Sequence, residues 1–406
     1  MKFDSVSLQD RPTPTVGTAR WSPRIALFSG NYNYVRDGAN QALNRLVAHL
    51  EQEIGAHVRI YSPTTRTPAF EPAGTLVSVP SIGFPGRRDY RLATGFQRRI
   101  RADLAAFAPD LVHLSAPDIL GTKALGWAKT RGLTVVTSLH TRFETYFSYY
   151  GLGFVRHWAE RHLASFYSRS DFVLVPTQSI LEEMLPGRTD DRIRLWSRGV
   201  DRELFDPVRR DYGWRRTMGI ADDEVALLFF GRLVLEKGVD SFIAISRALG
   251  ENGLRTRPLI VGDGPARQRL ASALPNAVFT GYLSGIPLAR AIASADIMIN
   301  PSVTEAFGNV VLEGLASGIA VISADAPSAR AMVAHGENGL LCPPRCPAAY
   351  ISAASRLIRS PEERHALSAA ARETSASYSW DTALDAVIAV YREALGERAA
   401  DRSLAA

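Results

Sequence analysis

The sequence predicts an α/β protein of two domains, each built on a doubly wound parallel sheet, that face one another across a cleft. Three observations lead to this fold class. The chain has 406 residues, more than a single hydrophobic core normally supports. Short apolar runs alternate with helical stretches, which is typical of parallel strands joined by helices. The alternation stops at a polar, charged link at 201–224 and then starts again.

The first half of the chain carries a series of short apolar runs bounded by turn residues. Helices are expected over 39–53 and 101–107, with a polar loop before the second helix. Strands are expected within 24–30, 57–63, 75–80, 110–117, 133–140, 171–178 and 193–199.

The second half repeats this pattern and ends in a helical segment at 379–395 whose apolar residues share one face. Strands are expected within 225–232, 258–264, 277–283, 297–302 and 320–325. The expected organisation is a flexible tail at 1–22, an amino-terminal domain at 23–200, a carboxy-terminal domain at 201–378, a closing helix at 379–397 and a second tail at 398–406. Ligands of doubly wound sheets bind at the carboxyl ends of the strands, so we expect the binding site in the interdomain cleft.

Composition excludes several classes of protein. With 46% hydrophobic and 22% charged residues, the chain is typical of globular proteins. Its apolar runs are far shorter than the ~20 residues that span a bilayer, and the first residues lack the apolar core of a secretory signal. Two cysteines, Cys342 and Cys346, give no disulfide framework, so the cytoplasm is the expected compartment.

The net charge of +6 favours an anionic partner. No helix-turn-helix, zinc-finger or RNA-binding pattern accompanies the charge, which argues against nucleic acid. An anionic membrane surface and a phosphorylated substrate are both compatible with it. No Asp-x-Asp occurs in the chain and the histidines do not cluster at ligand spacing, so no metal site is expected.

The segment PSVTEAFGNVVLEGLASG, at 301–318, is the strongest functional signal. Gly308 and Gly318 bracket a predicted helix. The N–H groups at its start attract an anion, and Gly308 allows the backbone to approach that anion closely. Glu305 precedes the helix and Glu313 lies within it, where a carboxylate can accept hydrogen bonds from a diol. A nucleotide-sugar offers both the anion and the diol, although each glutamate alone could be an ordinary loop or helix-surface carboxylate.

Other motifs follow strands at similar positions. Arg232 and Lys237, in GRLVLEKG, lie between a strand and a helix and could neutralise a diphosphate, whereas isolated pairs of this kind are usually solvated. Gly262 lies in the tight turn GDGP. His140 ends the run TVVTSLH, where a single histidine is more often structural than catalytic; His113 is expected in the core.

The ordered set of GRLVLEKG, VGDGP and two glutamates separated by seven residues resembles retaining GT-B glycosyltransferases of the sucrose-synthase/mannosyltransferase type, a family 4 type. This resemblance runs from about 225 to 323. In the first half it rests on TSLHTRFETY, at 137–146, and on the loop near Gly38. There the chain is most similar to bacterial lipid glycosyltransferases and sulfolipid-synthase-like enzymes.

The resemblance implies roles for individual residues. His140, Arg232, Lys237 and Glu305 would be catalytic, with Arg232 and Lys237 gripping the donor diphosphate. Gly38, Gly262, Phe307, Gly308, Asn309 and Glu313 would bind the donor, Glu313 through the ribose hydroxyls. TGYL, with Gly281 and Tyr282, occupies the place of the base. The loop before Gly38 departs from the Gly-Gly pair of relatives, and Asn31 and Arg36 there are weaker candidates.

The resemblance implies a retaining, metal-independent transfer of a hexosyl unit, of mannosyl or glucosyl/uronosyl type, from a GDP- or UDP-linked donor to a hydroxyl acceptor. The nucleotide-sugar is a substrate, and no cofactor is expected. The acceptor would be a membrane lipid or glycolipid, with a soluble or polyprenyl-linked glycan as an alternative. Competing hypotheses are a nonhydrolysing sugar-nucleotide epimerase of the same fold and a nonenzymatic binding protein derived from a transferase.

Membrane contact is a separate hypothesis. Arginines and aromatic residues are concentrated at 87–107 and again at 143–170. Such a rim can rest on the anionic inner face of the plasma membrane, although packing on one face and solvent on the other would give the same pattern.

Overall fold

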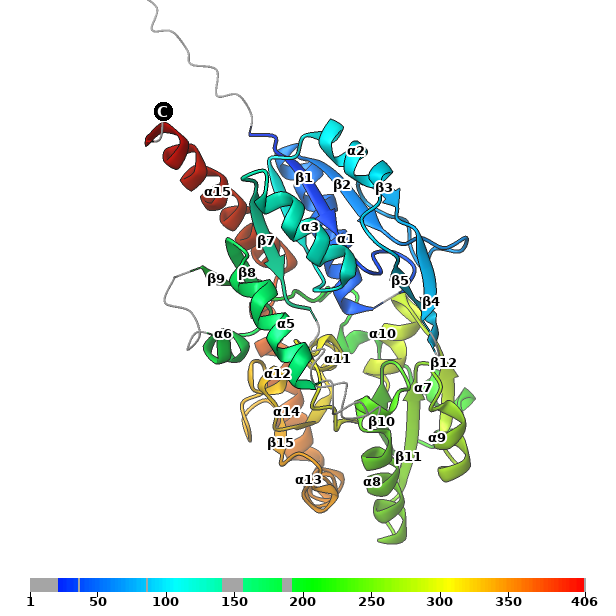
Figure 1. Ribbon diagram of the computed structural model, residues 1–406. Coiled ribbons are helices and arrows are strands. Elements are labelled where there is room, and N and C mark those ends of the chain that lie inside the picture. Colours follow the sequence, from blue (N-terminus) through cyan, green and yellow to red (C-terminus); the bar gives the residue numbers. More distant parts are fainter. Residues whose placement is uncertain (1–20, 36, 85–86, 141–155, 185–191, 405–406) are drawn as a thin grey trace, which may run out of the picture.

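The computed structural model describes residues 21–35, 37–84, 87–140, 156–184 and 192–404. Two parallel sheets, each covered by helices on both faces, lie one above the other (Figure 1). The first has seven strands in the order β3-β2-β1-β6-β7-β8-β9, and the second has six in the order β12-β11-β10-β13-β14-β15. The predicted pair of doubly wound, Rossmann-like units is confirmed.

The first sheet is buried between two layers of helices. The helices α1 and α15 cover one face, and α2, α3 and α5 cover the other. Burial on both faces explains why its central strands are continuous apolar runs. Its strands are β1 (Arg24–Phe28), β2 (His57–Ser62), β3 (Thr75–Ser78), β6 (Leu111–Leu114), β7 (Thr134–Ser138), β8 (Phe172–Val175) and β9 (Ile193–Leu195), and its helices are α1 (Gly38–Ile54), α2 (Arg98–Phe107), α3 (Ile119–Lys129), α5 (Arg156–Ser168) and α6 (Gln178–Met184).

The second sheet has the same construction. Residues of α8, α9 and α13 pack on one face and residues of α10, α11 and α14 on the other. Its strands are β10 (Val225–Phe230), β11 (Thr256–Val261), β12 (Val278–Gly281), β13 (Ile297–Asn300), β14 (Ala320–Ala324) and β15 (Leu340–Cys342), and its helices are α7 (Tyr212–Thr217), α8 (Val239–Glu251), α9 (Arg267–Ala273), α10 (Gly285–Ala293), α11 (Asn309–Ala316), α12 (Pro327–Arg330), α13 (Pro347–Arg359) and α14 (Pro361–Thr374).

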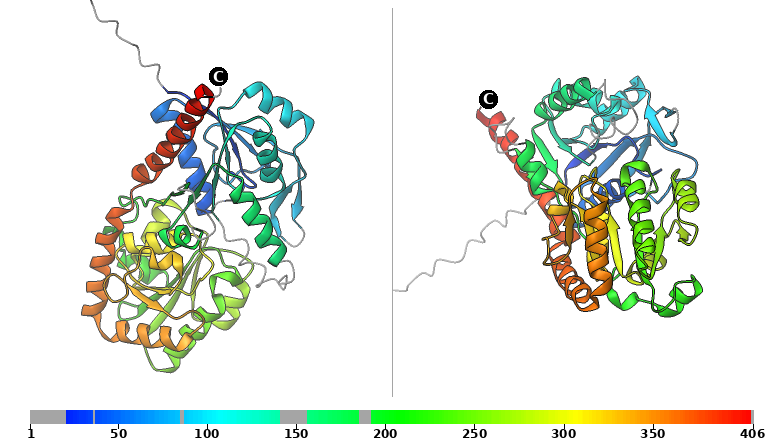
Figure 2. Two further views of the ribbon diagram at one scale, coloured as in Figure 1. Left: turned by 60° about the vertical axis from the view of Figure 1, so that its left-hand side comes forward. Right: turned by 90° about the horizontal axis from the view of Figure 1, so that it is seen from below.

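The last helix, α15 (Trp380–Leu404), returns from the second unit to the first (Figure 2). Leu384, Val387 and Tyr391 are buried in the same apolar cluster as α1 and β1. Gly199 contacts the start of this helix so closely that a Cβ there would lie 2.2 Å from the Trp380 nitrogen. The helix therefore ties the two halves of the chain together at the side of the cleft.

Several elements differ from the sequence-based expectation. The loop expected before α2 contains an antiparallel hairpin of β4 (Ser81–Phe84) and β5 (Arg87–Ala93), whose strands satisfy each other's backbone N–H and C=O groups. The link at 201–224, for which no helix was expected, contains α7. The strand β15 was not expected from the sequence either. The short apolar run of β15 is extended by its pairing with β14, which is a tertiary effect.

The expected tails also need correction where they are described. Trp21 packs against the first core and lies under the guanidinium of Arg392, and the Ser22 hydroxyl donates to the Gly55 carbonyl. At the other end, α15 continues to Leu404 instead of ending at 397, because the segment is rich in good helix formers. The rest of the first tail, at 1–20, lies outside the described residues. No described helix has the length and apolarity needed to cross a membrane.

Candidate functional site

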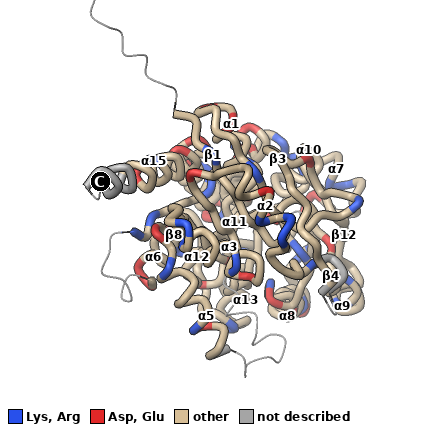
Figure 3. The backbone as a smooth tube through the Cα atoms, turned by 45° about the horizontal axis from the view of Figure 1, so that its top comes forward, with Lys and Arg blue, Asp and Glu red and all other residues tan. Residues whose placement is uncertain are grey.

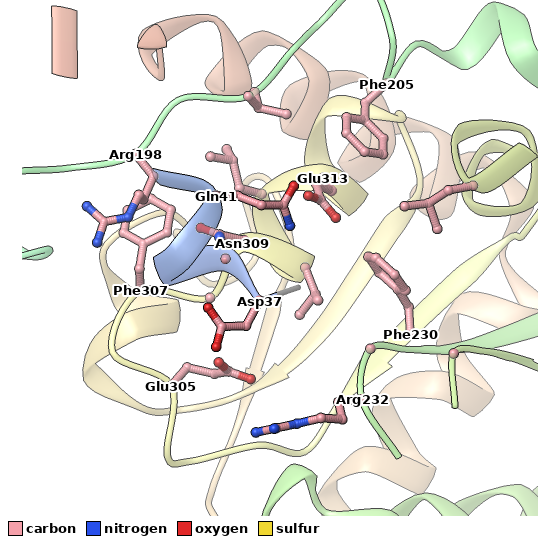
Figure 4. Close-up of a pocket in the computed structure, with 18 of the residues that line it drawn as sticks. Asp37, Gln41, Arg198, Phe205, Phe230, Arg232, Glu305, Phe307, Asn309 and Glu313 are labelled. Atoms are coloured by element: carbon pink, nitrogen blue, oxygen red, sulfur yellow. The ribbon is translucent and has the colours of Figure 1, made fainter. Parts of the chain in front are cut away.

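A cavity of about 1070 Å³ lies between the two sheets and is lined by both halves of the chain (Figure 4). Its second-half wall is formed by the loops that follow β10, β11, β12 and β13. Its first-half wall comes from the start of α1 and from residues that follow β7 and β9. The carboxyl ends of parallel strands from both sheets therefore converge on this cavity, as the fold predicts.

All ten predicted site residues line this cavity. They are His140, Arg232, Lys237, Glu305, Gly38, Gly262, Phe307, Gly308, Asn309 and Glu313. Of the segment proposed for the base, Tyr282 and Leu283 line the cavity, whereas Gly281 is not part of its lining. Arg36 lies outside the described residues, and so does the segment at 143–155.

The cationic part of the cavity is formed by Arg232 and Lys237. Lys237 ends the short 3₁₀ helix η4 (Leu235–Lys237) and forms an ion pair with Glu305, and both side chains are largely buried. The Nη1 atom of Arg232 is buried and has no hydrogen-bond partner among the described residues. A buried guanidinium nitrogen without a partner costs free energy, so Arg232 is left with capacity for an additional acceptor.

The start of α11 offers backbone N–H groups to the same region. Gly308 precedes the helix with φ of 96°, a conformation that favours glycine, and no side chain caps the helix there. The Oδ1 atom of Asn309 is also buried without a described partner. A helix N-terminus with uncapped N–H groups beside two cations is suited to bind an anion.

Two close backbone approaches shape the cavity. A Cβ on Gly262 would lie 1.9 Å from the Gly231 carbonyl oxygen, so the loops after β10 and β11 can meet only with glycine there. A Cβ on Gly38 would lie 1.9 Å from Nδ2 of Asn309. The start of α1 and the start of α11 are thus in contact across the cleft.

Glu313 lies in the middle of α11 and lines the cavity. Burial raises the pKa of its carboxyl to about 8, and the charge of Arg45 on α1 acts in the opposite direction. The Arg45 guanidinium stacks 5.0 Å from the centre of the Trp380 ring, and both residues line the cavity. Figure 4 shows Glu313 near Gln41 of α1.

His140 is held by a chain of hydrogen bonds that begins at Arg198. Nη2 of Arg198 donates to Nδ1 of His140 over 2.9 Å, and Nε2 of His140 lies 2.7 Å from the Ser138 hydroxyl. The same hydroxyl lies 2.7 Å from Nε2 of His113, whose Nδ1 contacts the Tyr391 hydroxyl on α15. His113 is buried, as expected.

This chain fixes the tautomer of His140. An arginine can only donate, so Nδ1 of His140 must accept and Nε2 carries the proton. Burial, together with the charge of Arg198, holds the pKa of His140 well below its usual value, so the ring is neutral. Both ring nitrogens are engaged, and a substrate contact through either of them would replace one of these hydrogen bonds.

Sequence reasoning missed Asp37, Arg45 and Arg198, which all line the cavity. Arg198 follows β9 and is 3% exposed, and its guanidinium stacks on Trp196. Asp37 precedes α1 and was not predicted, because the loop that contains it departs from the sequence pattern of the family. The available signal for Asp37 and Arg198 was their position after strands of the first sheet, whereas Arg45 lies within α1 and carried no such signal. Among the described residues, no group of three or more histidine, cysteine or acidic side chains could hold a metal ion.

The tautomer of His140 is a direct test of this geometry. We expect ¹⁵N NMR of the histidine rings to show His140 protonated at Nε2 and without titration between pH 5 and 8, because burial and Arg198 oppose a second proton. The ring of the exposed His157 gives a reference signal in the same spectrum. An His140 ring that becomes doubly protonated near pH 6.5 would contradict the hydrogen-bond chain.

Comparison with known proteins places this geometry in a family. The description "Glycosyl transferases group 1" matches residues 224–360, and "Glycosyltransferase Family 4" matches residues 36–204. A GDP-mannose-dependent alpha-mannosyltransferase of Mycolicibacterium smegmatis is 34% identical over 92% of this chain and 98% of the relative. The sulfoquinovosyl transferase SQD2 of Arabidopsis thaliana is 29% identical over 89% of this chain and 71% of the relative.

Solved structures show the same fold at lower identity. Sucrose-phosphate synthase from Thermosynechococcus elongatus has a TM-score of 0.75 at 20% identity, covering 92% of this chain and all of that one. Anabaena Alr3699/HepE, in complex with UDP and glucose, has a TM-score of 0.69 at 16% identity, covering 91% of this chain and 99% of that one. The chain therefore belongs to the GT-B glycosyltransferases of the group 1 and family 4 type, enzymes that use nucleotide-sugar donors.

Proposed function

We propose that the protein transfers a mannosyl unit from GDP-mannose to a hydroxyl of a membrane lipid or glycolipid, with retention of anomeric configuration and without a metal ion. The observation that carries this proposal is the buried Nη1 of Arg232, which has no hydrogen-bond partner among the described residues, in a cavity that Lys237 and the start of α11 also line. The relatives support the choice of donor, because three of them are named GDP-mannose-dependent alpha-mannosyltransferases. The glycolipid acceptor has similar support from an alpha-monoglucosyldiacylglycerol synthase of Streptococcus pneumoniae, 25% identical over 78% of this chain.

The diphosphate is proposed to lie between the two cations and the start of α11. Arg232 offers a planar set of donors and Lys237 a point charge, and charge-assisted hydrogen bonds of this kind are about twice as strong as neutral ones. Lys237 is already paired with Glu305, so donor binding adds a second anionic partner to the same ammonium. Together the two cations supply the positive charge that other transferases take from a divalent ion.

The nucleoside is proposed to extend from Gly262 toward Glu313 and Tyr282. Gly262 lines this part of the cavity, where the Gly231 carbonyl leaves no room for a Cβ. Glu313 would accept hydrogen bonds from the ribose hydroxyls when it is ionised. The base would lie against the loop that follows β12, which forms that part of the wall.

In the proposed reaction the acceptor hydroxyl attacks the anomeric carbon on the face from which the diphosphate departs. The bond between the anomeric carbon and the phosphate oxygen breaks, a bond to the acceptor oxygen forms, and the acceptor proton passes to the departing β-phosphate oxygen. No protein nucleophile is needed. The protein contributes by orienting both substrates and by stabilising the leaving diphosphate with Arg232 and Lys237 in a cavity shielded from water.

An epimerase of the same fold would need no acceptor and would change the sugar of the donor itself. Incubating the protein with GDP-mannose alone separates the two functions. An altered nucleotide-sugar without any transfer product would favour the epimerase. The relatives that span nearly the whole chain are transferases by name, which supports transfer.

The role of Lys237 can be tested by substitution. We expect Lys237→Ala to lower kcat for mannose transfer from GDP-mannose by about 10²–10³-fold, because one donor to the developing phosphate charge is lost. The matched control is Lys129→Ala, since Lys129 is also paired with a carboxylate, that of Asp171, but does not line the cavity. Circular dichroism should show both variants folded. A Lys237→Ala variant with near-normal turnover would contradict the diphosphate assignment.

The raised pKa of Glu313 predicts a pH dependence of donor binding. With a pKa of about 8, the carboxyl is protonated at pH 7 and becomes ionised as the pH rises past 8. An ionised carboxylate accepts from both ribose hydroxyls, so the KM for GDP-mannose should fall by up to about tenfold between pH 7 and 9. Glu313→Gln should abolish this change and keep a high KM. The same pH dependence in the Gln variant would show that another group is responsible.

Peripheral membrane contact is proposed on the basis of exposed apolar and aromatic residues beside basic ones. Ile82 of β4 is 58% exposed and Trp158 of α5 is 71% exposed. The β4–β5 hairpin and α5 both extend toward the second unit (Figure 1). Basic residues lie along α5 (Figure 3). The remainder of the predicted rim, at 143–155, lies outside the described residues.

Sedimentation with vesicles tests this contact. The protein should pellet with vesicles that contain anionic lipid at low salt and much less at high salt, because screening weakens the attraction of basic residues to the surface. Trp158→Ala should reduce pelleting, whereas Val208→Ala, which removes an 83% exposed residue of the second half, should not. No pelleting at any salt concentration would rule out the membrane proposal.

A further inference from the structure

Asp37 is the carboxylate that the first half of the chain brings to the cavity beside the cations. It is the N-cap of α1, and its Oδ1 accepts a hydrogen bond of 2.8 Å from the backbone N–H of Asn40. The contact between Gly38 and Asn309 places this helix start against the start of α11. Asp37 therefore lies where the two halves of the site meet.

The surroundings of Asp37 are unusual for an N-cap. Burial raises the pKa of its carboxyl, while the nearby charges of Arg232 and Lys237 act to lower it. Figure 4 labels Asp37 of the first half together with Glu305 and Arg232 of the second half among the residues that line the cavity. The helix cap uses backbone N–H groups only, and no side-chain donor in the described part of the chain binds this carboxylate.

The charges around Asp37 bear on the proposed reaction, because the donor diphosphate is itself an anion. Two acidic side chains, Asp37 and Glu305, line the cavity together with the two cations, Arg232 and Lys237. A diphosphate between the cations adds negative charge, so it competes with both carboxylates. The described hydrogen bonds of the Asp37 carboxylate come from backbone N–H groups at the start of its own helix, so a ligand hydroxyl beside the diphosphate can add a further donor. Sugar and polyol hydroxyls are the donors that the substrates of this reaction supply.

We propose that Asp37 is a substrate-contacting residue whose carboxylate accepts a hydrogen bond from a hydroxyl at the transfer centre. The hydroxyl belongs either to the transferred sugar or to the acceptor. This inference rests on the proposed function and adds a residue of the first half to it. In front-face attack the acceptor oxygen, the anomeric carbon and the leaving phosphate lie close together, so a group near Arg232 and Lys237 is near both hydroxyl sources.

The carboxylate acts by orientation. It accepts a hydrogen bond and takes no proton, since the acceptor proton passes to the departing phosphate oxygen. Fixing the direction of one hydroxyl holds the reacting atoms in a productive geometry, and the loss of such a contact lowers the rate without removing the other parts of the site.

The test separates the charge of Asp37 from its role as a helix cap. Asn and Ser are good N-caps and Ala is not. Asp37→Asn and Asp37→Ser should therefore fold and bind GDP at least as well as the wild type, judged by the thermal shift that GDP causes. Their kcat/KM for mannose transfer should fall about 10–100-fold, within the range of a lost orienting contact. Asp211→Asn is the matched control, because Asp211 caps α7 in the same way outside the cavity.

The two hydroxyl sources give different results. If the hydroxyl belongs to the transferred sugar, Asp37→Asn should weaken binding of GDP-mannose relative to GDP and should slow hydrolysis of GDP-mannose without acceptor. If it belongs to the acceptor, both of these should stay unchanged, and only transfer should be impaired.

Other results would overturn the inference. Normal transfer by Asp37→Asn and Asp37→Ser, with a defect only in Asp37→Ala, would show that Asp37 is a helix cap and nothing more. The same conclusion follows if every variant loses GDP binding and stability in parallel. A wild-type protein that binds GDP but transfers no mannose would instead reject the proposed function and, with it, this inference, so the two failures are distinguishable.

Discussion

Contact between the first turns of two helices from different halves of the chain is the constraint on which the site depends. The start of α1 meets the start of α11 at Gly38 and Asn309, where only glycine leaves room for the asparagine side chain. Because each helix follows a strand of its own sheet, this contact fixes how the two sets of strand ends face each other. Everything that binds in the cavity must fit around it.

The electrostatics of the cavity follow from that contact. Arg232, Lys237 and Glu305 come from the second half, and the carboxylate of Asp37 comes from the first. Lys237 and Glu305 already pair within the second half, and the first half brings Asp37 to the same cavity, a partly buried space in which charges interact more strongly than in water. In the part of the chain that the structure describes, Nη1 of Arg232 and Oδ1 of Asn309 are buried without a hydrogen-bond partner, so both can bind a ligand in the cavity.

The part of the cavity wall around His140 is held by a chain of hydrogen bonds. The chain from Arg198 through His140, Ser138 and His113 reaches Tyr391 on α15, so the closing helix takes part in fixing a cavity residue. Burial lowers the pKa of the Arg198 guanidinium to about 9, and it therefore stays charged at neutral pH. Its direction of donation sets the tautomer of His140.

The sequence by itself determined the two-sheet α/β fold, most strands, and the residues of the second-half wall. These features are local, since apolar runs buried on both faces and glycines at tight turns leave a pattern within a few residues. Only the tertiary structure decided the β4–β5 hairpin, the pairing of β15, and the parts played by Asp37, Arg45 and Arg198 in the cavity wall. These features depend on residues far away in the chain. The charge of Arg232 acts on the carboxyl of Asp37, and the guanidinium of Arg198 donates a hydrogen bond to the ring of His140. A sequence shows which side chains are present, but the burial and charge that define their chemistry arise only when separate strand ends meet.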